Sequence, residues 1–425
     1  MNPSKPFYYG LLIAGMSLGT AWAIRGQFGH EHGAAWAGSI GSLVIILLAK
    51  RPDWYPKALK ATVAGAIGWG LGGIMSYGMV VGYGRGIDFG NVYYGLAMLF
   101  VIGGLYGFLG GGLFGLALSD SRDKPVSWAG LLVEMVVMAV VFYFFMVEQF
   151  GWLMTPPRSE LWAACLGMAV ALAWYLTRNG HSAALRVAVY AGLGGGFGFA
   201  FGNFLQVLGH VSEIKFNFWN VMEYTLGFCG GIGMAYGTFT ANWRQTSSLE
   251  SPKRNWFPIV LLVLVIPFVV WDQNFETERV SKMLEPLTSM DLESATQLTQ
   301  TVSFLLIVCA GLYWTFMFYF ANPPIALSYQ NLRNFFLAHF TLYTLCSLLI
   351  TGTFLSTYRI EQYLYVVNLL IVGLLIGKVK AVFAPQPNAP RQWGTLLAGI
   401  LVFVALLALI AISSHGELKG AQVRF

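Results

Sequence analysis

The chain has 425 residues, of which 56% are hydrophobic and only 10% are charged, and its mean hydropathy is +0.63. Ordinary soluble domains carry about 25% charged residues, so this composition excludes that class and predicts an all-α, polytopic integral membrane protein. The net charge of +6 does not require a nucleic-acid partner, because the basic residues lie between apolar segments rather than in one patch. No phosphate-binding loop, nucleophile elbow or nucleic-acid module occurs, and no cofactor is indicated.

Apolar segments close to the roughly 20 residues that span a bilayer follow one another from end to end. We expect thirteen transmembrane helices, over residues 7–24, 33–50, 58–82, 93–118, 127–148, 161–177, 184–208, 220–242, 256–271, 302–321, 333–353, 362–381 and 393–413.

Residues 25–33, with the sequence RGQFGHEHG, separate the first two apolar segments. Ionisable groups at the edge of a membrane are costly and usually face a partner or a water-filled cavity. The three glycines permit a sharp turn or a re-entrant backbone. The stretch therefore predicts a functional site, and the alternative is a polar connector in water.

The basic residues are distributed unevenly between the two sides of the predicted topology. With the N-terminus in the cytoplasm, sixteen of the 25 Lys and Arg residues fall in inner segments and nine in outer ones. This bias follows the positive-inside rule and places the C-terminus outside, in a multi-pass protein of the cell membrane, as in a bacterial inner membrane. Residues 25–33 then face the extracytoplasmic side.

Glycine divides the chain, since 42 of the 50 glycines precede residue 245. Glycine-rich transmembrane helices pack backbone to backbone. We therefore expect a tightly packed eight-helix membrane module over 1–245, a cytoplasmic linker over 246–255 and a five-helix module over 256–425.

The first module also indicates a tandem repeat of four helices, about 1–125 and 126–245. Four pairs of short segments match in order at offsets of 120 to 129 residues: 27–29 with 149–151, 68–78 with 194–204, 88–92 with 217–221 and 107–111 with 227–231. Shared glycine-rich composition is the alternative explanation. A true duplication would relate the copies by an axis along the membrane normal, as in some transporters.

Polar residues collect at the outer ends of this module, where facing repeats would bring them together. The predicted substrate-binding residues are Arg25, Gln27, His30, Glu31, His32, Arg85, Asp88, Gln149, His210, Asn217 and Glu223. Glu134, about two turns inside the fifth predicted helix, is a candidate proton carrier, although a snorkelling or locally bonded carboxylate fits the pattern as well. The His30, Glu31 and His32 run could bind zinc together with His210 and Glu213, but it lacks a metal-motif spacing, so no metal site is predicted.

Arg25, Arg85 and Lys215 favour an anionic ligand, and Glu31 and Glu223 are the acids that could neutralise Arg25 when the site is empty. These features predict a secondary transporter or permease for a small polar, anionic solute, although few polar groups fall at the midplane of the predicted helices. Two alternatives stay open. One is a membrane enzyme facing the outer leaflet, with His30 or His32 as base, and the other is a non-catalytic, oligomer-forming subunit of a membrane complex.

Overall fold

The computed structural model describes residues 5–244, 256–322 and 324–425, and no strand occurs in those residues. The predicted linker 246–255 lies outside the described residues. The helices of the first part are α1 (Lys5–Arg25), α2 (His30–Ala49), the 3₁₀ helix η1 (Pro52–Lys57), α3 (Ala58–Gly72), α4 (Gly78–Tyr83), α5 (Phe89–Ser119), α6 (Trp128–Tyr143), the π-helical turn η2 (Phe144–Gln149), α7 (Trp162–Arg178), α8 (Ser182–Val211) and α9 (Phe218–Thr240).

The helices after residue 255 include two further π-helical turns. They are α10 (Phe257–Val260), η3 (Leu261–Val265), α11 (Ile266–Asn274), α12 (Thr277–Leu284), α13 (Leu292–Thr315), η4 (Phe316–Phe320), α14 (Tyr329–Ile350), α15 (Ile360–Leu375) and α16 (Pro390–Ser414). Eight helical segments in the described residues are long and apolar enough to cross a membrane. The prediction of a helical membrane protein is confirmed to that extent, whereas the full set of thirteen spans stays a prediction.

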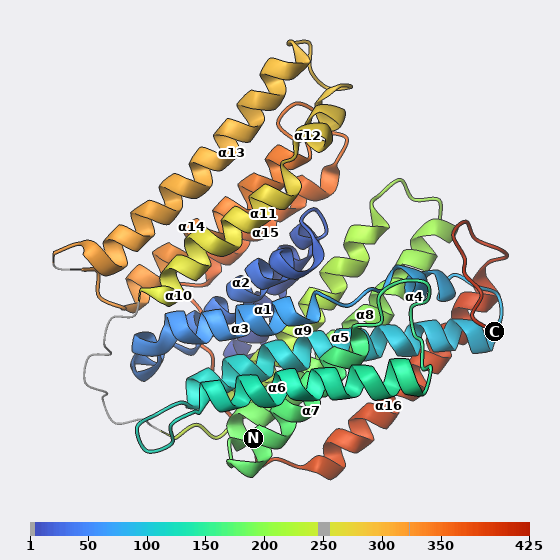
Figure 1. The fold of residues 1–425 in the computed structure, drawn as a ribbon, viewed down its shortest axis with the longest axis horizontal. Helices are drawn as coiled ribbons and strands as arrows, with labels where there is room; N and C mark the ends of the chain where they lie inside the picture. The colour runs from blue at the N-terminus through green and yellow to red at the C-terminus, as the bar shows by residue number, and fades with distance from the viewer. Residues whose placement is uncertain (1–4, 245–255, 323) are drawn as a thin grey trace.

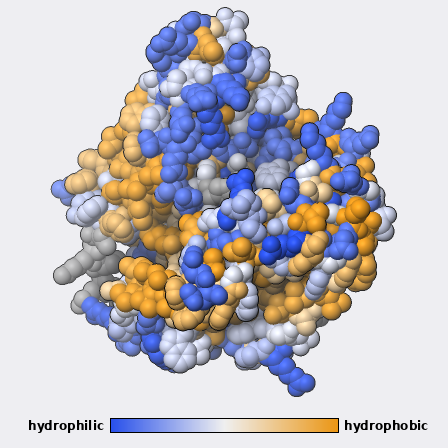
Figure 2. Space-filling model, turned by 45° about the vertical axis from the view of Figure 1, so that its right-hand side comes forward, coloured by the Kyte–Doolittle hydropathy of each residue, from blue (hydrophilic) through white to orange (hydrophobic). Residues whose placement is uncertain are grey.

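Much of the surface of the helices is hydrophobic. Figure 2 shows hydrophobic surface on both flanks of the molecule, with hydrophilic residues between them on the face toward the viewer. The segment Trp128–Gln149 is the most lipid-like, since only 11% of its apolar window is buried inside the protein. Such a surface is stable only when it is covered by lipid or by another apolar surface.

The centre of the fold is a row of helices in which α5 packs on α8, α8 on α9, and α9 on α1. Glycines bring these backbones together. A Cβ atom added to Gly107 on α5 would lie 2.0 Å from the carbonyl oxygen of Ala191 on α8, and one added to Gly194 on α8 would lie 2.3 Å from that of Cys229 on α9. No side chain fits at either position, so the glycines set the close approach of these helices.

The helices after residue 255 do not all pack together. Figure 1 shows α13 and α14 on one side of the central row and α16 on the opposite side, where α16 packs on α5 and α8. The extended segment 376–389 joins the two sides. Its amides at Ala381, Ala384 and Gln386 donate to the carbonyls of Leu48, Phe239 and Thr240 at 2.8–2.9 Å.

The two predicted repeat copies have different surroundings. The helices α1 and α2 are mostly buried inside the protein, whereas the corresponding helices α6 and α7 pack on each other and α6 is largely exposed. Duplication therefore stays a prediction.

One predicted helix is wrong in its length. Residues 58–82 were expected to form one span, but α3 ends at Gly72, residues 73–77 are non-helical, and α4 begins at Gly78. Consecutive glycines at 72 and 73 weaken the helix, and the chain turns there. This break places Tyr77 beside the end of α1.

Successive loops of the chain lie alternately at two ends of the molecule. We call one the Lys57 end, since the amine of Lys57 donates to the carbonyls of Leu118 and Asp120 at 2.6 and 3.1 Å. The other is the Arg25 end, where Gln27, in the loop after α1, contacts Arg279 and Arg359.

Candidate functional site

The site is built around the end of α1. After α1 the chain continues in tight turns, in which three successive backbone amides each donate to the carbonyl three residues earlier; the last is the amide of Phe28, which donates to the carbonyl of Arg25 at 2.9 Å. The helix α2 begins after Gly29. A Cβ atom on Gly33 would lie 2.3 Å from the carbonyl oxygen of Phe28, so only glycine allows the chain to fold back this closely. This return holds the Arg25 side chain in the interior, where it is 2% exposed.

Four side chains from distant parts of the chain form a polar cluster around Arg25, which we call the Arg25 cluster: Arg25, Tyr77, Tyr106 and Glu223. The guanidinium donates to the hydroxyls of Tyr77 and Tyr106 at 2.7 and 3.1 Å. It also lies 3.3 Å from a carboxylate oxygen of Glu223. Tyr77 in turn donates to the Glu223 carboxylate at 2.7 Å, so its hydroxyl bridges the two charges.

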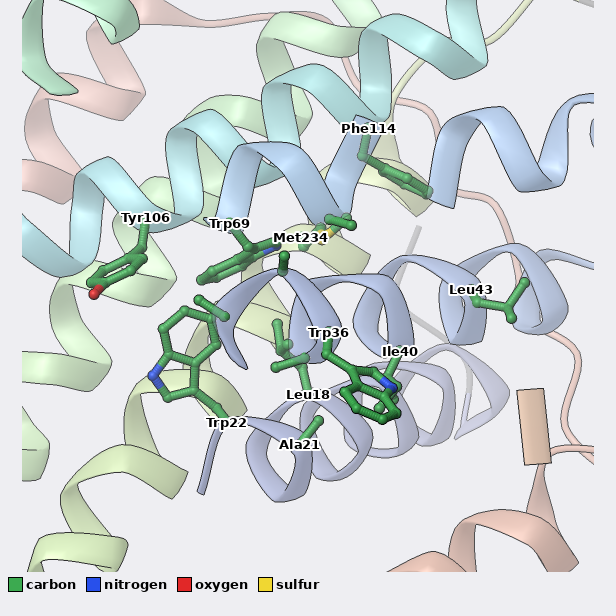
Figure 3. Close-up of a cluster of buried hydrophobic side chains, with 14 of the residues drawn as sticks. Leu18, Ala21, Trp22, Trp36, Ile40, Leu43, Trp69, Tyr106, Phe114 and Met234 are labelled. Carbon is green, nitrogen blue, oxygen red and sulfur yellow. The ribbon is translucent and has the colours of Figure 1, made fainter. Parts of the chain in front are cut away.

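Aromatic rings enclose the guanidinium carbon of Arg25. The ring centroids of Trp22, Tyr77 and Tyr106 lie 5.3, 5.6 and 5.9 Å from it, within the range of cation–π attraction. Trp69 packs edge-to-face on Trp22 with 4.9 Å between centroids, and Figure 3 shows Trp22, Trp69 and Tyr106 side by side from α1, α3 and α5. The cation is thus surrounded by π faces, hydroxyls and one carboxylate.

The charges in this cluster are removed from water, since the side chains of Arg25 and Glu223 are 2% and 1% exposed. Two ions in such a place are stable only when each compensates the other and further hydrogen bonds satisfy them.

Comparison of the chain with protein-family models, curated proteins and solved structures finds no match. The chemistry of the site therefore rests on its geometry: a buried cation paired with the Glu223 carboxylate and two tyrosine hydroxyls.

The loop after α1 is tied to the helices that follow residue 255. Arg279 donates to the backbone carbonyl of Gln27 at 2.6 Å, and Arg359 donates to its side-chain oxygen at 3.3 Å. Burial lowers the pKa of Arg279 from its ordinary value, and the nearby carboxylate of Glu276 partly opposes this effect. Gln27, predicted as a ligand, thus connects α12 and α15 to the Arg25 cluster.

A second buried carboxylate lies near Glu223. Glu361, at the start of α15 and 5% exposed, accepts hydrogen bonds from the amides of Asn217 and Asn220 at 3.1 and 3.3 Å. Asn220 lies one turn before Glu223 on α9, next to Gly26. The sequence analysis missed Glu361, because it directly precedes an apolar segment and resembles an ordinary helix start.

Several predicted residues lie instead around a separate cavity of about 400 Å³ at the Arg25 end, which we call the Arg85 cavity. It is lined by Arg85, His210, Glu213, Asn217 and Trp219, among others. Burial lowers the pKa of Arg85. Arg25 and Glu223 do not line this cavity, so the structure distributes the predicted residues between two places.

The remaining predicted residues have other positions. Asp88 is exposed and caps α5, accepting a hydrogen bond from the amide of Asn91 at 2.9 Å. Gln149 is exposed at the end of η2, and Glu31 is exposed on the first turn of α2. His32 is half-buried, and one buried nitrogen of its ring has no hydrogen-bond partner among the described residues. The side chain of His30 lies outside the described residues.

Glu134, the candidate proton carrier, forms an ion pair with Arg178 on α7 at 2.7 Å. Both side chains are partly exposed, at 33% and 42% respectively. Within the described residues, no group of three or more His, Cys, Asp and Glu side chains could hold a metal ion.

The two tyrosines of the Arg25 cluster are the functional candidates that the sequence analysis missed. Tyr77 lies near the end of the predicted span 58–82, where a tyrosine resembles part of an interfacial belt, and Tyr106 lies at the middle of the span 93–118, where it resembles one more packing residue. The glycine pair at 72 and 73 was the only signal that the chain breaks just before Tyr77.

Proposed function

We propose that the protein is a secondary transporter or permease for a small polar, anionic solute, and that the solute replaces Glu223 as the partner of Arg25. The observation that carries the proposal is the buried Arg25–Glu223 pair beside the break between α3 and α4. Broken helices with buried polar groups are typical of solute sites in secondary transporters. An intramembrane ion pair is also expensive to keep unless it has a role.

A chain of polar groups supports a route to this pair. Asn217 lines the Arg85 cavity and shares the carboxylate of Glu361 with Asn220, one helical turn from Glu223. A solute that enters at Arg85 and His210 would first meet these amides. Trp219 at the cavity wall offers a flat surface against which a sugar ring can stack.

The proposal includes the topology expected from the basic residues. The Lys57 end is cytoplasmic, the Arg25 end and the C-terminus are extracytoplasmic, and the chain crosses the cell membrane thirteen times. Cysteines placed at positions 123 and 420, which are exposed at the two ends, should therefore react with membrane-impermeant reagents from opposite sides. Labelling of both from one side contradicts this part of the proposal.

The test of function is a thermal-shift screen of the purified protein with sugar acids, sulfated sugars and dicarboxylates. Wild type should be stabilised by at least one anionic compound, Arg25→Ala should lose the shift, and Arg25→Lys should keep part of it, because the charge remains while the planar fork is lost. Glu223→Gln should increase the shift, since it frees Arg25 from its competing carboxylate. Flux of the active compound into proteoliposomes then distinguishes transport from binding.

Arg178→Ala is the matched control, since it removes an Arg from a partly exposed pair. Equal shifts in wild type and Arg25→Ala, or shifts only with neutral or cationic compounds, contradict the anion site.

A further inference from the structure

A large cavity at the Lys57 end lies between the first part of the chain and the helices after residue 255. Its volume is about 1110 Å³, slightly above the range of roughly 300–1,000 Å³ found for small-molecule sites. The walls come from α3, from the end of α5 and the following loop, from α10, and from η4 with residues 325–327. None of the residues of the Arg25 cluster or the Arg85 cavity contributes to it.

The cavity is amphipathic. Apolar side chains of α3, including Val63, Ala64 and Ile67, form one wall, and Phe257 and Phe318 belong to the facing helices. Ile67 is 42% exposed although it lies inside an apolar helix. This exposed apolar lining suits hydrocarbon better than a water-soluble ligand.

Charged groups line the same cavity close to the helix ends. Lys57, Lys60 and Arg122 contribute three positive charges and Asp120 one negative charge, so the rim has a net charge of +2. Lys60 forms an ion pair with Asp120 and lies 5.1 Å from the ring centroid of Trp128. Lys60 nevertheless remains 47% exposed, so its ammonium group is accessible to a headgroup.

We infer that this cavity, which we call the Lys57 cavity, is a binding site for an anionic phospholipid. The phosphate of the headgroup is held by Lys60 and Arg122, and the acyl chains lie along Val63, Ala64 and Ile67. Basic pockets between transmembrane helices commonly bind cardiolipin and related lipids in this way. Trp128 fits the same arrangement, because tryptophan prefers the level of the lipid headgroups.

The arrangement of the walls gives such a lipid a structural consequence. Across the cavity, α10 and η4, which belong to the chain after residue 255, face α3 and the loop after α5, which belong to the first part. A bound lipid fills the space between them with hydrocarbon. It should therefore stabilise the packing of α10 and η4 against α3.

The test is native mass spectrometry and thermal unfolding of the delipidated protein in detergent, after titration with phosphatidylglycerol, cardiolipin or phosphatidylcholine. The anionic lipids should bind and raise the unfolding temperature, and phosphatidylcholine should do so far less. Each basic residue near an anionic headgroup contributes about fivefold in affinity, so Lys60→Gln with Arg122→Gln should weaken binding about 25-fold. Lys378→Gln with Lys380→Gln removes two exposed charges outside the cavity and should leave binding unchanged.

A second variant tests the apolar wall separately. Ile67→Trp keeps all charges but fills the space for an acyl chain, and it should lower lipid binding without changing the behaviour of the lipid-free protein on gel filtration. Inorganic phosphate should not compete. Equal binding of phosphatidylcholine, competition by phosphate, or equal loss in the Lys378 and Lys380 control each overturns the anionic-lipid site.

Discussion

The Arg25–Glu223 pair allows a direct comparison of a buried and a partly exposed ion pair in one protein. Substituting Arg25→Met removes the cation and leaves the Glu223 carboxylate, 1% exposed, without its counter-charge, although the Tyr77 hydroxyl still donates a hydrogen bond to it. Removing one partner of a buried pair costs about 3–5 kcal/mol, because the other charge stays uncompensated. The Arg178–Glu134 pair has the same residue types at 42% and 33% exposure, and such pairs contribute about 0.2–1 kcal/mol.

The double substitution makes this comparison sharper. Adding Glu223→Gln to Arg25→Met removes the uncompensated charge, so the double variant should be more stable than Arg25→Met alone. The corresponding pair Arg178→Met with Glu134→Gln should show changes that add within about 0.5 kcal/mol. Urea unfolding in mixed micelles, followed by tryptophan fluorescence, measures the free energy of unfolding of wild type, the four single variants and the two double variants. If the loss in the Arg25 and Glu223 double variant equals the sum of the two single losses, the electrostatic explanation of the cluster is refuted.

Three further outcomes follow from contacts outside that pair. Tyr77→Phe should cost about 1–3 kcal/mol in stability and reduce the anion-induced thermal shift, because Arg25 loses a hydrogen-bond acceptor and Glu223 loses a donor. An unchanged shift would contradict the role of this hydroxyl. Gly107→Ala should destabilise the protein by about 1–3 kcal/mol, because the added Cβ atom would lie 2.0 Å from a carbonyl oxygen of α8. Gly104→Ala should be tolerated, because its Cβ atom would lie 3.6 Å from the nearest carbonyl oxygen of α8. Equal unfolding midpoints of the two variants would show that α5 and α8 can separate freely. Burial, and secondarily the charge of Lys124, lower the pKa of His181 from 6.5 to about 4. Between these pH values the unfolded chain binds a proton that the folded protein does not, so the free energy of unfolding should fall as the pH drops from about 6.5 to about 4. His181→Asn should remove that part of the pH dependence in unfolding titrations.

The helical framework could be predicted well because it depends on local sequence. Runs of apolar residues define most of the helices, and α5 and α8 begin and end within about four residues of the predicted spans, whereas α13 begins at Leu292, ten residues before the predicted span 302–321. The error at 58–82 shows the limit of that reasoning. Hydropathy is continuous through Gly72 and Gly73, and only the conformational freedom of two glycines indicates the break.

The candidate site could be predicted only in part, because its partners are far apart in sequence. Arg25 and Glu223 were recognisable as charges in an apolar context, and Glu223 was one of two acids expected to neutralise Arg25. Tyr77 and Tyr106 could not be distinguished from other aromatic residues, since their role depends on which helices meet. Asp88 illustrates the opposite error: its position three residues before Asn91 is an ordinary helix-capping pattern, which a local analysis could have recognised.

The contacts of Gln27 suggest how the helices after residue 255 could influence the Arg25 cluster. Arg279 and Arg359 reach Gln27 from α12 and from the start of α15, while Glu361, two residues beyond Arg359, holds Asn217 and Asn220 near Glu223. A displacement of α15 would therefore change both the loop after α1 and the α9 segment that carries Glu223. A buried ion pair is stable only in a narrow geometry, so under the proposed function a small shift there would favour exchange of Glu223 for a solute anion. This coupling gives the chain after residue 255 a direct part in the proposed transport cycle.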